Sequence, residues 1–278
     1  MWVNNREIKE LSENIRKIID GQNIDLRDNR EGVWSILKND IHTLASLKNE
    51  RAATLGQERD AMAETLTNIS HQLKTPLTSM MIMADLLDFS ADNSDKQAEF
   101  IANIKTGLVR MEWLASALLK MAKLDAGMAE FSKEPIQAAA LVALALEPLQ
   151  ILLEVKEQNI EVNCDIELLC DKRWTAEALI NVIKNAMEYS PKGGKIRIEA
   201  GMNPICRWVS VTDSGAGIPK AKIAGLFKRF EASQNDKGHG IGLPLALAIM
   251  HRQGGDIEVD GGNGKSATFV LKFYGNTI

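Results

Sequence analysis

At residues 70–77 the chain reads Ser70-His71-Gln72-Leu73-Lys74-Thr75-Pro76-Leu77, within a longer stretch whose apolar residues have helical spacing. Ile69 and Leu73 lie one turn apart and predict the buried face of this helix. His71 is two residues from each, about 200° around a helix of 3.6 residues per turn, so its imidazole is expected to face solvent. Thr75 shares the face of His71. Pro76 lacks a backbone N–H, so the helix is expected to bend there.

The flanking sequence predicts a helical hairpin over residues 50–127. Apolar residues form two stripes separated by a polar break: Leu55, Met62, Leu66, Ile69 and Leu73, and then Ile101, Ile104, Leu108, Met111, Ala115, Leu118 and Ala122. This alternating spacing of three and four residues is typical of helices that pack lengthwise. One such hairpin is half of a four-helix bundle, so the pattern predicts a homodimer that supplies the other half.

Residues 1–49 contain two shorter stretches with the same spacing. The apolar positions are Ile8, Leu11, Ile15 and Ile18, and, after a polar connector, Trp34, Leu37, Ile41 and Leu44. Two short amphipathic helices bury little apolar surface alone and suit a parallel dimer. The arrangement resembles a HAMP signal-relay module, and an ordinary helical hairpin is an alternative that the sequence leaves open.

Residues 138–278 mix helices and strands and follow a linker at residues 128–137. Alternating apolar residues predict strands at 160–166, 196–198, 209–211, 257–259 and 267–273. The apolar run from Ala138 to Val155 contains Glu147 and Pro148, so it is expected to form a buried helix rather than a membrane span. Helices on one face of a mixed sheet are the simplest arrangement for this segment.

Three motifs in the same segment carry chemistry that suits a nucleotide. Asn181 and Asn185 share one helix face, and carboxamide oxygens suit Mg²⁺. Asp213 follows a strand and can accept a hydrogen bond from an adenine amino group, while Gly215 and Gly217 allow close backbone approach. A second glycine motif opens a helix whose free amides can hold phosphate: Gly238-His239-Gly240-Ile241-Gly242-Leu243. Each motif alone is weak evidence, because each also occurs in ordinary turns and helices.

Together, in this order, these motifs and residues 70–77 resemble the sensor histidine kinase family over about residues 50–273. The resemblance implies a HAMP-like segment (1–49), a dimerisation and histidine phosphotransfer hairpin (50–127), a linker (128–137) and a catalytic ATP-binding domain (138–278). The last is expected to be an α/β sandwich of the Bergerat type. The resemblance further implies that ATP phosphorylates His71, which then passes the phosphoryl group to an aspartate of a response regulator receiver domain.

The Ser-His-x-x-x-Thr-Pro-Leu pattern resembles the phosphoacceptor box of that family. A neutral imidazole at His71 is a competent nucleophile near physiological pH. Gln72 stands where the commonest family pattern has a carboxylate; an amide can orient the ring but cannot act as a base. Activity is still expected, because positioning and electrostatics dominate phosphoryl transfer. Thr75 stands where relatives orient water for dephosphorylation of the partner.

The resemblance also implies where ATP and Mg²⁺ bind. Asn185 is the implied Mg²⁺ ligand, Tyr189 is expected near the adenine, and Lys228 or Arg229 is expected to neutralise phosphate charge. The polar stretch 231–237 is expected to be a mobile lid that His239 lines. The implied nucleotide-binding set is Asn181, Asn185, Tyr189, Asp213, Gly215, Gly217, Ile218, Lys228, Arg229, Phe230, Gly238, His239, Gly240, Ile241, Gly242, Leu243 and Thr268.

Composition limits the other possibilities. The net charge is −4 and no block of lysine and arginine occurs, so a nucleic-acid partner is not expected. The cysteines, Cys164, Cys170 and Cys206, lack metal-ligand spacing and are expected to be reduced thiols. No signal peptide is recognised. The resemblance implies the cytoplasmic portion of a plasma-membrane protein, attached through a segment upstream of this chain.

Two rival interpretations stay open at the level of sequence. One is a different ATPase of the same fold that hydrolyses ATP to drive a clamp, although such proteins lack the histidine-bearing hairpin. The other is a scaffold or phosphatase-biased protein that binds nucleotide and partner without phosphorylating itself, for which Gln72 is the support.

Overall fold

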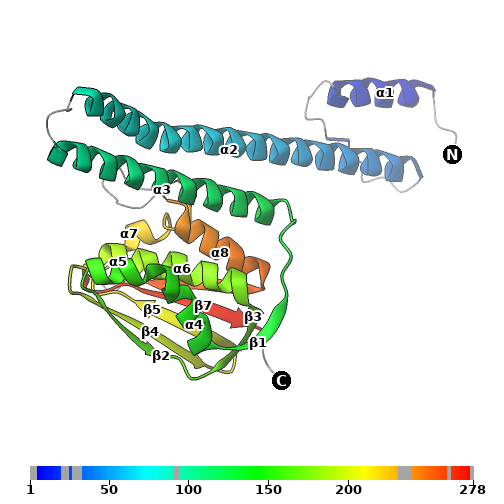
Figure 1. Cartoon of the computed structure of the whole chain (residues 1–278). Coiled ribbons are helices and arrows are strands. Elements are labelled where there is room, and N and C mark those ends of the chain that lie inside the picture. The colour runs from blue at the N-terminus through cyan, green and yellow to red at the C-terminus, as the bar shows by residue number, and fades with distance from the viewer. Residues whose placement is uncertain are drawn as a thin grey trace. The chain divides into compact units, whose positions relative to one another are not determined.

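The computed structural model describes residues 5–19, 25–26, 33–89, 94–230, 240–261 and 264–275 of the 278-residue chain. The chain divides into two compact units, residues 1–67 and residues 68–278. Figure 1 shows the elements in chain order, from α1 near the N-terminus to β7 near the C-terminus.

The first unit contains helix α1 (Asn5–Ile19) and the first part of helix α2 (Val33–Phe89). Of the predicted apolar stripe on α1, Leu11 is buried and Ile15 and Ile18 are half-buried, whereas Ile8 is exposed. The stripe on α2 is less covered within one chain, because Leu37 and Leu44 are exposed. Helix α2 continues without interruption past residue 50, so no helix end marks the predicted boundary between residues 49 and 50. That boundary stays a prediction.

The second unit begins with the rest of α2, and helix α3 (Ser94–Asp125) runs back along it (Figure 1). The two helices approach closely at Gly107, where an added Cβ would lie 2.6 Å from Met80 Sδ. Many apolar side chains of this hairpin are nevertheless exposed: Leu77, Met81, Ile82, Leu86, Ile101, Leu108, Val109 and Leu119. The hairpin of one chain therefore leaves apolar surface uncovered, as half of a helical bundle would.

A five-stranded mixed sheet forms the base of the C-terminal domain, which we call the sheet domain (residues 133–275). Its strand order is β2-β4-β5-β7-β6, and only β2 and β4 pair in parallel among the described strands. The strands are β2 (Asn159–Asn163), β4 (Lys195–Met202), β5 (Cys206–Thr212), β6 (Gly255–Asp260) and β7 (Thr268–Tyr274). Alternate side chains such as those of Ile196, Ile198, Val209 and Val211 are fully buried, because successive residues of a strand face opposite sides.

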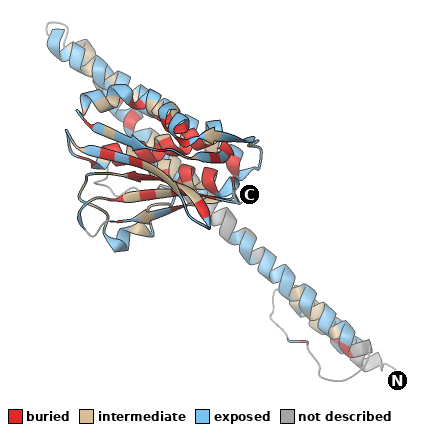
Figure 2. Ribbon diagram, turned by 90° about the horizontal axis from the view of Figure 1, so that it is seen from below, coloured by how far each residue is buried: buried red, intermediate tan, exposed pale blue. Residues whose placement is uncertain are grey.

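Helices cover one face of this sheet (Figure 1). They are α4 (Ala138–Leu146), a 3-10 turn η1 (Glu147–Leu149), α5 (Gln150–Val155), α6 (Lys172–Tyr189) and α8 (Gly242–Arg252), with the short α7 (Lys220–Ile223) after β5. Figure 2 shows buried residues concentrated between the sheet and this helical layer. The predicted α/β sandwich is confirmed.

Two local predictions were wrong. The strand predicted at 160–166 is present as β2 but ends at Asn163, where the chain turns, and a further strand that was not predicted, β3 (Glu167–Asp171), follows it. Strand β1 (Lys133–Gln137) lies in the predicted linker and pairs antiparallel with β3 in a separate two-stranded sheet. β1 carries Pro135 and charged residues, so the alternation that predicts strands is missing, and pairing with β3 is what makes it a strand.

The apolar run Ala138–Val155 is long and apolar enough to cross a membrane by length and composition. Its helix is interrupted at Glu147–Leu149, where Pro148 stands, and Ala138, Leu141, Val142 and Ala145 are buried in the core of the sheet domain. The run therefore forms part of the helical layer, as the sequence predicts.

Candidate functional site

The imidazole of His71 is exposed on α2, as its helical position predicts. Leu73 is half-buried and packs against the core cluster that continues into α3 and the sheet domain. Thr75 Oγ1 donates to the His71 carbonyl oxygen at 3.1 Å, so its hydroxyl lies one turn from His71 on the same side of the helix. Pro76 is buried within α2, which continues to Phe89. The imidazole at position 71 is thus accessible from solvent.

Helix α6 carries the two asparagines, and its N-terminus is fixed by Asp171. One carboxylate oxygen of Asp171 accepts the backbone N–H of Trp174 at 2.9 Å, and the other accepts that of Ser132 at 2.8 Å. Gln253, at the end of α8, accepts the Asp171 backbone N–H at 2.7 Å and exchanges hydrogen bonds with Thr175. These buried bonds tie β1, α6 and α8 to one another, so the helices that bear the candidate motifs share one anchor.

The C-terminus of α6 is held by residues that precede β2. Gln158 Nε2 donates to the carbonyl oxygens of Met187 at 3.0 Å and Ser190 at 3.1 Å, and Lys156 Nζ donates to Met187 at 2.7 Å. The last carbonyls of a helix have no partner within the helix, so such donors stabilise its end. Ser190 Oγ in turn accepts the backbone N–H of Ser214 at 3.2 Å. The end of α6 is thereby joined to the loop that follows β5.

The packing of α6 against α8 brings two of the predicted motifs together. Asn181 is only 4% exposed and its Nδ2 donates to the Glu177 carbonyl oxygen at 2.8 Å. An added Cβ on Gly242 would lie 2.9 Å from Asn181 Oδ1, so this glycine permits close contact between the helices. Asn185 lies one turn further along α6 and is half-buried. A carboxamide oxygen at Asn185 suits a Mg²⁺ ion that takes its other ligands from phosphate and water.

Asp213 is buried at the end of β5 and is held from two sides. Its Oδ1 accepts the backbone N–H of Gly215 at 2.8 Å and of Ala267 at 3.1 Å. In the part of the chain that the structure describes, both of these side-chain bonds use Oδ1 and none uses Oδ2. Oδ2 is therefore the carboxylate atom that can accept a ligand donor such as an adenine amino group. Thr268 lies next to it in the sheet, with its Oγ1 3.0 Å from Thr212 Oγ1.

The glycines after Asp213 stand where a side chain would not fit. A Cβ on Gly215 would lie 2.6 Å from the Tyr189 carbonyl oxygen, so the loop touches the end of α6. Gly217 has a φ of +74°, and a Cβ there would lie 2.5 Å from the Gly261 carbonyl oxygen. Ile218 donates its backbone N–H to that same oxygen at 2.8 Å. Both predicted glycines are thus required by close backbone approach.

The second glycine motif begins α8, and a backbone hydrogen bond joins it to Phe230. Phe230 donates its backbone N–H to the Gly240 carbonyl oxygen at 2.8 Å, and both residues have a φ of +64°. Ile241 and Leu243 are buried, and within the described ranges no side chain caps the start of α8. Its first amides are therefore open to a phosphate group. The predicted lid at 231–237, Gly238 and His239 lie outside the described residues.

The two candidate phosphate-binding cations differ in surroundings. Lys228 and Arg229 are both exposed, and the Arg229 guanidinium forms two hydrogen bonds with Asp125 at the end of α3: Nη1 to Oδ2 at 2.7 Å and Nη2 to Oδ1 at 2.8 Å. The Asp125 carboxylate raises the pKa of Arg229 above its ordinary value.

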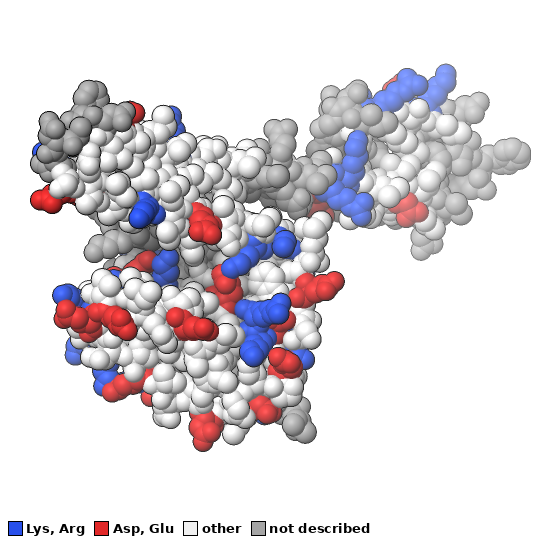
Figure 3. Space-filling model, in the orientation of Figure 1, with Lys and Arg blue, Asp and Glu red and all other residues white. Residues whose placement is uncertain are grey.

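Tyr189 is exposed, beside the loop of Gly215. Figure 3 shows acidic and basic side chains interspersed on the visible face of the sheet domain.

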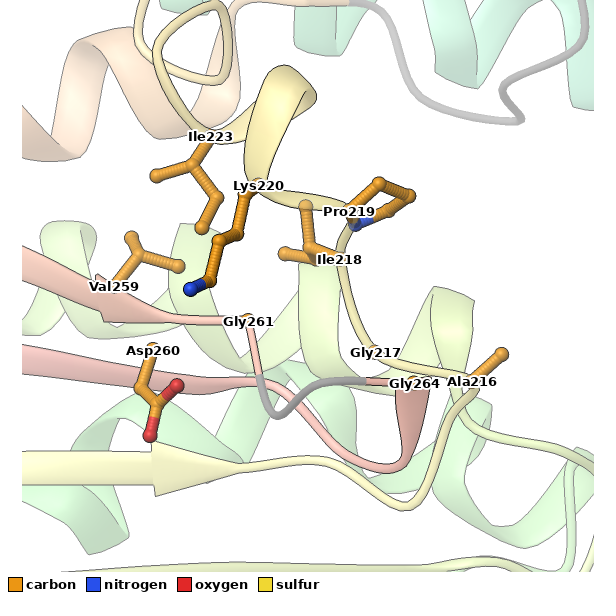
Figure 4. Close-up of a pocket in the computed structure, with 10 residues that line it drawn as sticks. All are labelled: Ala216, Gly217, Ile218, Pro219, Lys220, Ile223, Val259, Asp260, Gly261 and Gly264. Atoms are coloured by element: carbon orange, nitrogen blue, oxygen red, sulfur yellow. The ribbon is translucent and has the colours of Figure 1, made fainter.

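A cavity of about 750 Å³ is lined by two residues of the implied nucleotide-binding set, Gly217 and Ile218. It is bounded by the Gly217 turn, α7 and the end of β6, and Figure 4 shows the Lys220 side chain reaching toward Val259 and Gly261. Asn181, Asn185, Asp213 and Thr268 do not line it. The cavity therefore adjoins the glycine side of the candidate site and not the two asparagines.

The sequence matches two protein families, in the order in which the two parts of the chain were predicted. Residues 61–127 match the family described as His Kinase A (phospho-acceptor) domain. Residues 170–275 match the family described as histidine kinase-, DNA gyrase B-, and HSP90-like ATPase. The first match contains His71, and the second contains the asparagines, Asp213 and the start of α8.

Curated relatives are sensor proteins. The chain is 32% identical over 234 residues to the sensor histidine kinase WalK of Bacillus subtilis, covering 79% of this chain and 37% of WalK. It is 30% identical over 241 residues to the heme sensor protein HssS of Staphylococcus saprophyticus, covering 85% of this chain and 52% of that protein. The chain thus spans about half, or less, of the length of these relatives.

Solved structures share the fold. The histidine kinase ThkA, in a complex with the response regulator protein TrrA, has a TM-score of 0.63 at 21% identity, over 81% of this chain and 66% of ThkA. The histidine kinase AdeS of Acinetobacter baumannii has a TM-score of 0.60 at 21% identity, over 74% of this chain and 98% of AdeS.

A phosphoacceptor hairpin followed by an ATPase-type α/β domain defines the core of a histidine kinase. The chain belongs to the sensor histidine kinases.

Several residues that hold the site together escaped prediction from sequence. Gln158 and Lys156 cap α6 although they lie about 30 positions before its end, as the separations of 29 and 31 residues show. Gln253 acts across an even longer separation. Isolated polar residues with long-range partners leave no periodic signal. Gln158 directly precedes strand β2 and Gln253 directly precedes Gly254. Such positions are too common in sequences to predict a capping residue.

Proposed function

We propose that this chain is an ATP-dependent protein-histidine kinase that phosphorylates itself on His71 and passes the phosphoryl group to an aspartate of a response regulator. The observation that carries the proposal is that α6 contacts both other motifs, Gly242 at Asn181 in its middle and the loop after Asp213 at its C-terminal end. The same chain exposes a histidine on a helix that matches a phosphoacceptor domain.

The nucleotide is proposed to bind with its adenine amino group donating to Asp213 Oδ2 and its phosphates at the open start of α8. The amide groups of the first turn of α8 are aligned for an anion. Mg²⁺, held by Asn185 Oδ1 and the phosphates, would neutralise charge that develops on the transferring group. Selectivity for adenine follows, because a guanine presents an acceptor where Asp213 requires a donor.

The proposed reaction is an in-line displacement at the γ-phosphorus. A ring nitrogen of neutral His71 forms the new P–N bond, and the bond to the bridging oxygen breaks, so ADP leaves with the electron pair. The N–H of the other ring nitrogen can donate to Gln72 Oε1, which fixes the tautomer without removing the proton. Once the P–N bond has formed, the ring is a phosphoimidazolium, and it loses the proton of its other nitrogen to water. Thr75, one turn away, is proposed to orient water for a separate reaction, the hydrolytic dephosphorylation of the partner.

A second copy of the chain is the proposed partner of the hairpin. Exposed apolar residues on α2 and α3, among them Leu77, Met81, Ile101 and Leu108, supply the surface. The likeness to ThkA, which was solved in a complex with a response regulator protein, supports a receiver domain as the second partner. We also propose that the whole protein is attached to the plasma membrane upstream of this chain, which leaves residues 1–278 on the cytoplasmic side.

Incubation with γ-labelled ATP and Mg²⁺ tests the proposal. We expect acid-labile, base-stable label on the wild-type chain and none on His71→Gln. Hydrolysis of ATP without label would instead favour a clamp-type ATPase. Nucleotide binding with neither label nor hydrolysis would favour the non-catalytic scaffold that Gln72 suggests.

A further inference from the structure

The end of α3 contacts the sheet domain in two ways, through buried apolar side chains and through hydrogen bonds to arginine side chains. Leu114, Ala117, Met121 and Leu124 of α3 are buried in the same cluster as the inward residues of α8. Arg252 Nη2, at the end of α8, donates to the Leu124 carbonyl oxygen at 2.5 Å. The next residue of α3 is Asp125, whose carboxylate accepts hydrogen bonds from both Nη1 and Nη2 of the Arg229 guanidinium.

Arg229 stands at a particular point of the sheet domain. It directly precedes Phe230, whose N–H is bonded to Gly240, and Gly240 lies two residues before the first residue of α8. The backbone of Arg229 is therefore tied to the glycine segment that opens the proposed phosphate site. Its side chain is bonded to the Asp125 carboxylate on α3 and stays 39% exposed.

From this geometry we propose that Asp125 and the phosphate groups of the nucleotide compete for Arg229. The Asp125–Arg229 pair is then a latch that holds the sheet domain on its own stem until a nucleotide takes over the guanidinium. The inference rests on the proposed function, since it requires an adenine nucleotide at the start of α8. Both acceptors are planar or branched oxyanions that an arginine binds through two parallel N–H groups, so one guanidinium cannot serve both fully.

The size of the effect follows from the exposure of the pair. A shallow hollow lined by Leu124, Asp125, Ala248, His251 and Arg252 adjoins it and admits solvent. A solvated, two-point ion pair contributes modestly, so removing it is expected to tighten nucleotide binding about three- to tenfold and not more. Added salt screens such a pair and should shrink the difference.

The test uses the intact chain and compares Asp125→Asn with wild type. Asparagine keeps the shape and one acceptor but removes the charge. Lys120→Gln is the matched control: Lys120 lies on the same helix and its Nζ is 2.7 Å from Glu177 Oε1, so this ion pair also joins α3 to the sheet domain but does not involve Arg229. Dissociation constants are measured for a non-hydrolysable ATP analogue and for adenosine.

We expect Asp125→Asn to bind the analogue about three- to tenfold more tightly and adenosine with unchanged affinity, with Lys120→Gln like wild type for both. Unchanged or weaker analogue binding by Asp125→Asn would overturn the latch, as would an equal gain for adenosine, which would indicate release of the whole domain rather than competition for phosphate. A wild-type chain that binds neither ligand would refute the proposed function itself, a result separate from any difference between variants.

Discussion

Asn181 Oδ1 lies so near Gly242 that a single added methyl group on that glycine would come within 2.9 Å of it. The contact joins the middle of α6 to the first residue of α8, two segments that the sequence separates by about 60 positions. Because Asn181 is buried and its Nδ2 is bonded to Glu177, it cannot easily move away. The contact fixes the distance between the asparagine face and the amides that are proposed to hold phosphate.

Gly242→Ala is therefore expected to displace α8 from α6 and to weaken binding of an ATP analogue about tenfold, because overpacking of this kind typically costs about 1–3 kcal/mol. Isothermal titration calorimetry measures the affinity. Gly56→Ala is the control, since nothing lies within 4 Å of a Cβ added at Gly56. Equal affinities for both variants would show that the contact does not set the site.

Gly217→Ala is expected to lower the free energy of unfolding more than Gly193→Ala. Both glycines have similar positive φ values, +74° and +73°, so both variants carry the strain of a left-handed alanine. At Gly217 the Cβ would also meet the Gly261 carbonyl oxygen at 2.5 Å, whereas at Gly193 nothing lies within 4 Å. We expect about 1–3 kcal/mol between them in denaturant unfolding. A difference near zero would mean that the turn relaxes freely.

Gln158→Met is expected to destabilise the sheet domain by about 1–3 kcal/mol, because the Met187 and Ser190 carbonyls lose a buried donor. Thermal unfolding measures the change. Gln137→Met, at an exposed glutamine that makes no capping bond for α4, is the control. Stability unchanged by Gln158→Met would indicate that Lys156 alone suffices to cap α6.

Asn185→Ala is expected to abolish labelling that depends on Mg²⁺ and ATP while leaving adenosine binding intact, because the removed carboxamide oxygen is the proposed metal ligand and Asp213 is unchanged. Label incorporation and adenosine affinity are measured on the same preparation. Normal labelling by Asn185→Ala would refute the placement of the metal.

Stability is expected to fall as pH rises from about 9 to about 11. Burial raises the pKa of Cys164 and of Cys170 from 9.0 to about 11. In that window the unfolded chain loses thiol protons that the folded chain retains, so the free energy of unfolding decreases with pH, and the contribution is intact below pH 9. The double variant Cys164→Ala, Cys170→Ala should show a shallower decline in urea unfolding; an identical decline would assign the effect to other groups.

The sequence was sufficient for features that depend on local periodicity. The exposure of His71 followed from its place between Ile69 and Leu73, and the five predicted strands appear, with shifted ends, as strands β2, β4, β5, β6 and β7. The interrupted helix at Glu147–Leu149 followed from Pro148. In each case the signal and the structure lie within one turn or one strand.

Features that depend on distant partners were not accessible. Strand β1 exists because β3 pairs with it, and Asp125 meets Arg229 across 104 positions of sequence. The contact of Asn181 with Gly242 was expected only through the resemblance to a family, since nothing in their spacing requires it. Side-chain caps such as Gln158 are isolated polar residues, which carry no pattern at all.

The most direct test of the account is mass-spectrometric mapping, under alkaline conditions that preserve phosphohistidine, of the chain after incubation with ATP and Mg²⁺. We predict one added phosphoryl group on the peptide that contains residues 70–77, located on His71. A phosphoryl group on any other residue, or none on this peptide while the chain binds and hydrolyses ATP, would contradict it.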